Sequence, residues 1–287
     1  MNQPPHQPRR RLQRGIIILP SAFTLGNLFF GVYAVVMGLR GEYAWAGWFI
    51  VFAAALDLLD GRVARFTRTG SAFGAELDSL VDAISFGFAP ALIMILLYYD
   101  DPGWSWVLGF VYVTAVVVRL ARYNVEQGGD AKRHFHGLPS PTAGMILATY
   151  FPFSQTAFFE QQLGMLPWPQ IMGVTMILIS VLMLSHVPYA MVPRLEFRTV
   201  KGVMTTVLMA VGVVFALAIP AYWFFPALLA YTVWGLLKSV FMGLLERLPE
   251  RDPLMDTEDD EESEARPMDY RDIAPGSTDN DWKESSS

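Results

Sequence analysis

Long apolar segments follow one another along most of the chain, separated by short polar connections. Each segment runs for roughly 17 to 25 residues, the length that an α-helix needs to cross the hydrocarbon core of a bilayer. The pattern predicts eight such spans, at residues 17–39, 43–66, 75–99, 105–126, 140–160, 168–188, 201–219 and 221–246.

Apolar side chains surround each predicted helix instead of forming one stripe. Stretches such as VLGFVYVTAVVV and GVTMILISVLMLS have no polar face, whereas the surface helices of a large soluble protein would each present one to water. Of the 287 residues, 53% are hydrophobic and 17% are charged, which is less charge than an average soluble domain carries. The fold class is therefore an all-α integral membrane protein.

Basic residues are concentrated in alternate connections. Every Lys and Arg except Arg40 lies in the N-terminal segment, beside the connections after spans two, four and six, or at the C-terminal end. Because cytoplasmic loops of membrane proteins are enriched in Lys and Arg, both termini are predicted to face the cytoplasm. This orientation requires an even number of spans, in agreement with eight.

Charge also divides the chain into three regions. Residues 1–14 are basic, residues 15–248 hold the spans, and residues 249–287 are acidic and rich in Ser. The last region is expected to be a disordered cytoplasmic tail, and it accounts for much of the net charge of −6. The chain has no cysteine, which excludes disulfides and thiol chemistry.

Four aspartates interrupt this apolar pattern at the facing ends of the second and third spans. Asp57 and Asp60 are three residues apart, and Asp78 and Asp82 are four apart, so each pair shares one helix face. Carboxylates inside a span are costly, and four of them converging would repel strongly. Divalent cations that prefer oxygen ligands, namely Mg²⁺, Mn²⁺ or Ca²⁺, would relieve this repulsion.

Small residues and an arginine lie between the two carboxylate pairs. Gly61, Ala64 and Gly74 leave room for a bulky ligand, and Arg65 offers a planar charged group suited to phosphate oxygens. Carboxylates, divalent metal and arginine together favour pyrophosphate chemistry, with one carboxylate able to accept a proton from an attacking hydroxyl.

The spacing of these residues resembles the signature of the CDP-alcohol phosphatidyltransferases at every fixed position: Asp57-x-x-Asp60-Gly61-x-x-Ala64-Arg65, eight residues, then Gly74-x-x-x-Asp78-x-x-x-Asp82. The resemblance implies a core of six transmembrane helices, usually in a homodimer, with the active site near the cytoplasmic surface. It implies two divalent ions, Mg²⁺ or Mn²⁺, bound by Asp57, Asp60 and Asp78. Asp82 would be the general base and would also contact a metal.

The CDP site would be lined by Asp57, Gly61, Ala64, Arg65, Gly74 and Asn27. Asn27 has an alternative role, a hydrogen bond to a neighbouring helix.

Four further stretches resemble the membrane-embedded phosphatidylserine synthases: FTLGNLFFG, SLVDAISFGFAPA, RLARYNV and FHGLPSPTAG. This resemblance implies CDP-diacylglycerol and L-serine as substrates, two spans beyond the six-helix core, and a location in the bacterial inner membrane. The serine carboxylate or the phosphates would be bound by Arg119, Arg122, Asn124 and Ser140. Two of these residues have a simpler interpretation, since Arg122 at a span end could anchor to lipid headgroups and Ser140 lies at a helix start.

Other functions stay open at this point. The same chemistry could use another acceptor, such as glycerol 3-phosphate or inositol phosphate, although a dianionic acceptor should need a denser basic pocket. A cation transporter could use the aspartates as its ion site, but it leaves the fixed Gly, Ala and Arg positions unexplained. A scaffold role leaves the carboxylates unexplained, and no feature of the sequence suggests nucleic-acid binding.

Overall fold

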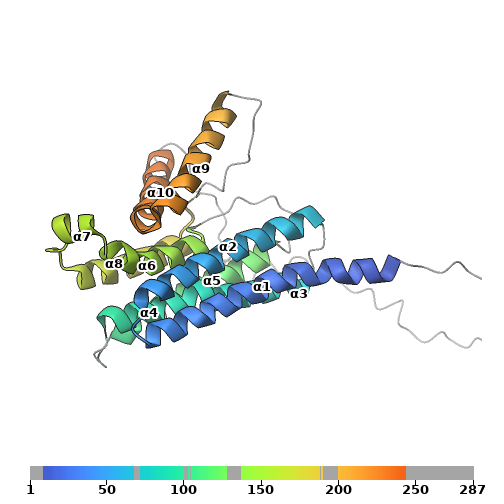
Figure 1. Ribbon diagram of the computed structural model, residues 1–287, viewed down its shortest axis with the longest axis horizontal. Coiled ribbons are helices and arrows are strands. Elements are labelled where there is room, and N and C mark those ends of the chain that lie inside the picture. The colour runs from blue at the N-terminus through green and yellow to red at the C-terminus, as the bar shows by residue number, and fades with distance from the viewer. Residues whose placement is uncertain are drawn as a thin grey trace, which may run out of the picture. The chain divides into compact units, whose positions relative to one another are not determined.

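The structure is a computed structural model that describes residues 9–67, 72–99, 103, 105–127, 137–187, 189 and 200–243. For residues 9–21, 64–67, 72, 126–127, 200–201 and 242–243 only the backbone is described. All elements in this part of the chain are helical (Figure 1). In chain order they are α1 (Arg9–Leu39), α2 (Tyr43–Thr67), α3 (Ala72–Asp82), the π-helix η1 (Ala83–Phe88), α4 (Ala89–Tyr98), α5 (Ser105–Gln127), α6 (Ser140–Ser154), α7 (Ala157–Gln162), α8 (Trp168–Leu184), α9 (Val200–Ala218) and α10 (Pro220–Gly243).

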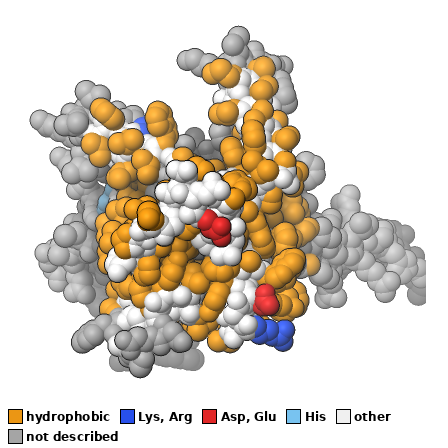
Figure 2. Space-filling view, turned by 60° about the vertical axis from the view of Figure 1, so that its left-hand side comes forward, with side chains coloured by type: hydrophobic (Ala, Val, Ile, Leu, Met, Phe, Trp, Pro, Cys, Tyr) orange, Lys and Arg blue, Asp and Glu red, His pale blue; other side chains and the backbone are white. Residues whose placement is uncertain are grey.

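Five helical segments are long and apolar enough to cross a membrane: Ala22–Leu39, Tyr43–Val63, Phe73–Tyr98, Ser105–Val125 and Pro220–Phe241. Large apolar side chains such as Phe29 (62% exposed) and Leu217 (80% exposed) face outward, and Figure 2 shows hydrophobic side chains over most of the described surface in that view. Such a surface suits lipid, which confirms an all-helical integral membrane protein. The remaining predicted spans coincide with α6 and with the shorter apolar segments Trp168–Leu184 of α8 and Gly202–Ala218 of α9, so the count of eight stays a prediction.

The first helices form a bundle in which α1 packs against α2, α2 packs against α6, and α5 packs against α8 (Figure 1). α6 also contacts η1, and this contact is very close: a Cβ built on Gly144 would lie 2.9 Å from Phe86 Cα. A glycine is therefore required there. The close approach places α6 against the middle of the helix that carries Asp78 and Asp82.

The third predicted span, 75–99, is one continuous helical rod with a wide π-turn at its centre. η1 begins directly after Asp82, and the consecutive residues Ser85 and Phe86 are both fully buried. Ser85 faces α1 while Phe86 faces α6. π-turns are rare and occur preferentially at functional sites, and this one lets two adjacent residues contact different neighbours.

One predicted boundary is wrong. The span expected at 140–160 ends as α6 at Ser154, and a separate short helix, α7, begins at Ala157. Thr156 caps α7, because its hydroxyl accepts a hydrogen bond from the Phe159 backbone N–H at 3.3 Å. A capping threonine starts a new helix and does not continue the old one.

Candidate active site

Three aspartates from two helices converge at one point. Asp57 on α2 and Asp78 and Asp82 on α3 each contribute a carboxylate oxygen, and these oxygens all lie within 4.8 Å of one another. Asp82 is buried, whereas Asp57 and Asp78 are partly exposed. The packing of the two helices thus brings Asp57 of the first sequence pair together with both members of the second pair.

Asp60 is the member that stands outside this cluster. It is only 6% exposed, and its Oδ2 accepts a hydrogen bond from the Thr24 hydroxyl on α1. Its charge nevertheless repels those of Asp57 and Asp78, so all four carboxylates belong to one electrostatic system.

Asn27 joins α1 to the other end of the cluster. It is fully buried, and its Nδ2 donates a hydrogen bond to Asp82 Oδ1 at 3.3 Å. The Ser85 hydroxyl in turn donates to the Asn27 backbone carbonyl at 3.3 Å. This is the interhelical hydrogen bond that the sequence offered as one alternative for Asn27.

The donor set of the cluster fits a hard divalent cation. All ligand atoms are carboxylate oxygens, which suits Mg²⁺ or Mn²⁺. Asp78 Oδ1 is buried and, within the described part of the chain, has no hydrogen-bond partner. Buried polar atoms are nearly always satisfied, so an oxygen left without a donor beside two like charges is well placed to bind a cation.

Arg119 and Ser140, two of the predicted acceptor-binding residues, lie together. Arg119 Nη1 donates to Ser140 Oγ at 3.0 Å, which links α5 to the first turn of α6. Among the described residues the buried Nε of Arg119 has no partner, and the guanidinium is attracted electrostatically to Asp82. A buried, positively charged hydrogen-bond donor therefore lies near Asp82, the carboxylate predicted to be the base.

The structure separates Arg122 and Asn124 from this pair. Arg122 Nη1 donates to the Leu184 carbonyl at the end of α8 at 3.3 Å. Asn124 is bound to α3, where it accepts from Ser79 Oγ at 3.1 Å and donates to Glu76 Oε2 at 3.3 Å. The guanidinium groups of Arg119 and Arg122 therefore bind different elements, α6 and α8 respectively.

The residues predicted to line the CDP site flank the carboxylates along the chain. Gly61 is exposed on α2 directly after Asp60, and Gly74 is partly buried one turn before Asp78 on α3. Ala64 and Arg65 lie near the end of α2, and their side chains fall outside the described residues.

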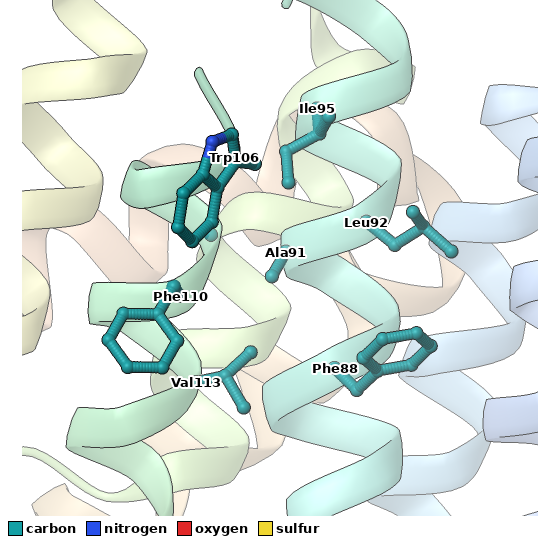
Figure 3. Close-up of a pocket in the computed structure, with 8 residues that line it drawn as sticks. Phe88, Ala91, Leu92, Ile95, Trp106, Phe110 and Val113 are labelled. Atoms are coloured by element: carbon teal, nitrogen blue, oxygen red, sulfur yellow. The ribbon is translucent and has the colours of Figure 1, made fainter. Parts of the chain in front are cut away.

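An apolar cavity of about 260 Å³ lies between α4 and α5, and it is separate from the charged cluster. Figure 3 shows Ala91 of α4 across from Trp106 and Phe110 of α5. The cavity is lined by Phe88, Ala91, Leu92, Ile95, Trp106, Gly109, Phe110 and Val113. No lining residue carries a titratable group, so this cavity can hold apolar groups but cannot perform the chemistry.

Sequence reasoning did not single out Thr24 or Ser85, although both contact the site residues. Thr24 lies three residues before Asn27, so both fall on one face of the first predicted span. That spacing was the available signal, since two polar residues on one face of an apolar helix need partners. Ser85 gave no comparable signal, because its burial depends on the π-turn.

Comparison with known proteins agrees with this geometry. The family model described as CDP-alcohol phosphatidyltransferase matches residues 17–217, which is more than half of the chain. The chain belongs to the CDP-alcohol phosphatidyltransferase family.

Relatives within the CDP-alcohol phosphatidyltransferases include bacterial, archaeal and yeast proteins. A CDP-diacylglycerol–serine O-phosphatidyltransferase of Helicobacter pylori is 28% identical over 228 residues, covering 79% of this chain and 93% of the relative. One of Mycobacterium tuberculosis is 38% identical over 146 residues, covering 49% of this chain and 51% of the relative. An archaetidylserine synthase of Methanothermobacter thermautotrophicus is 32% identical over 184 residues, covering 63% and 71% respectively.

Membership of the CDP-alcohol phosphatidyltransferases confirms the family expected from the aspartate signature, and it makes the chain a transferase. The family generally depends on divalent metal, which agrees with the acidic cluster of Asp57, Asp78 and Asp82. A cation transporter or a scaffold has no comparable support.

Proposed function

We propose that the protein transfers the phosphatidyl group of CDP-diacylglycerol to the hydroxyl of L-serine and releases CMP. The observation that carries this proposal is the convergence of Asp57, Asp78 and Asp82 from two helices, in a chain whose relatives carry the names of serine-specific enzymes.

Asp57, Asp60 and Asp78 would hold two divalent ions, with Asp82 contacting one of them. Asp57 and Asp78 each interact electrostatically with both Asp60 and Asp82, so bound cations would offset the repulsion among all four carboxylates. When bound, the ions neutralise the charge of the pyrophosphate and of the departing phosphate.

Asp82 would be the general base. The serine oxygen forms a bond to the β-phosphorus, which carries diacylglycerol, while the bond between that phosphorus and the bridging oxygen breaks. The hydroxyl proton passes to a carboxylate oxygen of Asp82, and CMP leaves with the bridging oxygen. The Asn27 amide occupies one Asp82 oxygen, so the other oxygen is the candidate proton acceptor.

The CDP group would bind along Asp57, Gly61, Ala64, Arg65 and Gly74, where small residues admit the nucleotide and Arg65 binds phosphate. Asn27 Oδ1 is buried without a partner in the described part of the chain, so Asn27 can accept a hydrogen bond from the nucleotide while it donates to Asp82.

The serine carboxylate would bind Arg119 and Ser140. Arg119 offers near Asp82 an Nε that has no partner among the described residues, so an acceptor whose carboxylate binds there would present its hydroxyl toward the base. Arg122 and Asn124 would act at a greater distance, by holding the C-terminal end of α8 and the middle of α3 against α5.

The protein would work as a homodimer in the bacterial inner membrane, with the aspartates and both termini on the cytoplasmic side. The distribution of Lys and Arg supports this orientation, and it places the carboxylates where CDP and serine enter from water.

The deciding experiment is CMP release by the purified protein from CDP-diacylglycerol with a panel of acceptors, each with Mn²⁺, Mg²⁺ or chelator. We expect release with L-serine and metal, and little release with glycerol 3-phosphate or inositol phosphate. Release with one of those alcohols but not with serine would contradict the serine assignment while leaving the transferase chemistry intact.

A further inference from the structure

Two polar residues of α1 contact two different carboxylates of the site. Thr24 donates to Asp60 on α2, and Asn27 donates to Asp82 on α3. Thr24 is 4% exposed and Asn27 is fully buried, so both hydrogen bonds are shielded from water. Since the donors are three residues apart, a single face of α1 serves both carboxylates.

The backbone of α1 lies unusually close to the aspartate helix, which makes this arrangement rigid. A Cβ built on Gly31 would lie 2.9 Å from Ser85 Cα, so only glycine permits the approach. At this contact the Ser85 hydroxyl donates to the Asn27 carbonyl at 3.3 Å. The position of Asn27 is therefore set by the backbone of the helix that carries Asp82.

A carboxylate on its own rotates readily about its last torsion, because that torsion is broad. A hydrogen bond from a rigid, buried donor occupies one oxygen and turns the other in a defined direction. The hydrogen bond from Thr24 therefore fixes the direction in which the second oxygen of Asp60 points with respect to Asp57 and Asp78. The hydrogen bond from Asn27 does the same for the second oxygen of Asp82, which would accept the proton of the serine hydroxyl. Comparable outer partners of metal ligands contribute about 10- to 100-fold to affinity or activity.

We infer that Thr24 and Asn27 are positioning residues with separate effects: Thr24 orients Asp60 for metal binding, and Asn27 orients Asp82 for proton acceptance. The inference rests on the proposed function for the part that concerns Asn27. The part that concerns Thr24 depends only on the carboxylates binding a divalent ion.

The test uses the full-length protein with Thr24→Val, Thr24→Ser and Asn27→Leu. Thr149→Val is the matched control, because Thr149 is also buried but donates to the Met145 carbonyl within α6, and among the described residues no hydrogen bond joins it to a carboxylate. Thr24→Val should raise the Mn²⁺ concentration for half-maximal CMP release about 10-fold, with most of kcat kept at saturating metal. Thr24→Ser should restore the wild-type value, and Thr149→Val should leave it unchanged.

Asn27→Leu should lower kcat about 10- to 100-fold while the KM for serine changes little. The Mn²⁺ dependence should change less than in Thr24→Val, because Asp82 contacts only one of the two proposed ions. Equal effects of Thr24→Val and Thr149→Val, or a fall in kcat and metal affinity together in both α1 variants, would overturn the separation of roles. If Asn27→Leu does not fold, Asn27→Ser replaces it, because serine is smaller than asparagine and adds no bulk at this buried position.

Mn²⁺ binding without substrate, followed by electron paramagnetic resonance, keeps the two proposals distinguishable. If the wild type binds Mn²⁺ and Thr24→Val weakens binding, the role of Thr24 stands even where serine proves to be the wrong acceptor. If Thr24→Val binds Mn²⁺ as the wild type does, the role of Thr24 is wrong whatever the acceptor.

Discussion

The four aspartates are the same side chain in four different surroundings, and these surroundings separate their roles. Asp60 accepts from Thr24, Asp82 accepts from Asn27 and is attracted to Arg119, and Asp78 has a buried oxygen without a partner in the described part of the chain. Asp82 both accepts a hydrogen bond from a buried donor and lies within the three-carboxylate cluster, and for these reasons we propose it as the base.

Replacing Asp82 with Asn should therefore abolish turnover. The amide has nearly the shape of the carboxylate but cannot accept the serine proton, and we expect a loss of at least about 100-fold in CMP release. Binding of CDP-diacylglycerol, measured by calorimetry in detergent, should be largely retained. A variant that releases CMP at a near-normal rate would show that another group is the base.

Arg119 and Arg122 offer a matched comparison, since they are one turn apart but contact different elements. Arg119→Gln should raise the KM for serine about 10- to 100-fold, because hydrogen bonds to charged groups contribute about 1.5–3 kcal/mol. Arg122→Gln should change it far less. Steady-state kinetics at fixed CDP-diacylglycerol measures both, and equal effects would contradict a carboxylate site at Arg119.

At the scale of helices, the site depends on close contacts to the π-turn. α1 reaches η1 at Gly31, and α6 reaches it at Gly144. These contacts hold the segment that follows Asp82 between two neighbours, so a change at either glycine should disturb the site through the backbone.

Gly144→Ala should destabilise the protein, although alanine favours an isolated helix by about 1 kcal/mol. The added Cβ would meet Phe86 Cα at 2.9 Å, and overpacking of this kind costs about 1–3 kcal/mol. Gly212→Ala on α9 is the control, because its Cβ would meet Trp223 at an ordinary 3.5 Å. Thermal unfolding in detergent should show a lower Tm for Gly144→Ala only, and an unchanged or higher Tm would contradict the close contact.

At the scale of the whole molecule, the orientation in the membrane rests on loop charge, and the absence of cysteine makes it testable. Glu42 lies in the exposed connection after α1, and His134 lies in the basic connection between the predicted fourth and fifth spans. In intact cells a membrane-impermeant maleimide should label Glu42→Cys, and His134→Cys only after the membrane is opened.

The unmodified chain provides the blank for that experiment, since it has no thiol to react. The reverse labelling pattern would place the aspartates on the outer side, away from cytoplasmic CDP-lipid, and would contradict the proposed orientation.

Local features of this protein could be read from the order of residues. Helices, apolar surfaces and the pairing of Asp57 with Asp60 and of Asp78 with Asp82 all depend on spacings of three or four residues, which a helix converts directly into a shared face. The eight specified residues of the motif, at their fixed spacings, were also enough to identify the family. Span boundaries were less accurate, as at Ser154, because a cap or a turn can end a helix within an apolar run.

The convergence of these faces was decided only by the tertiary structure. It separates Asp60 from the three-carboxylate cluster, pairs Arg119 with Ser140 but not with Arg122, and gives Thr24 and Asn27 their carboxylate partners. These contacts join residues up to 55 positions apart, such as Asn27 and Asp82, and depend on how closely two helix backbones approach. That distance is set by glycines such as Gly31 and by the π-turn after Asp82, whose effects no local spacing reveals.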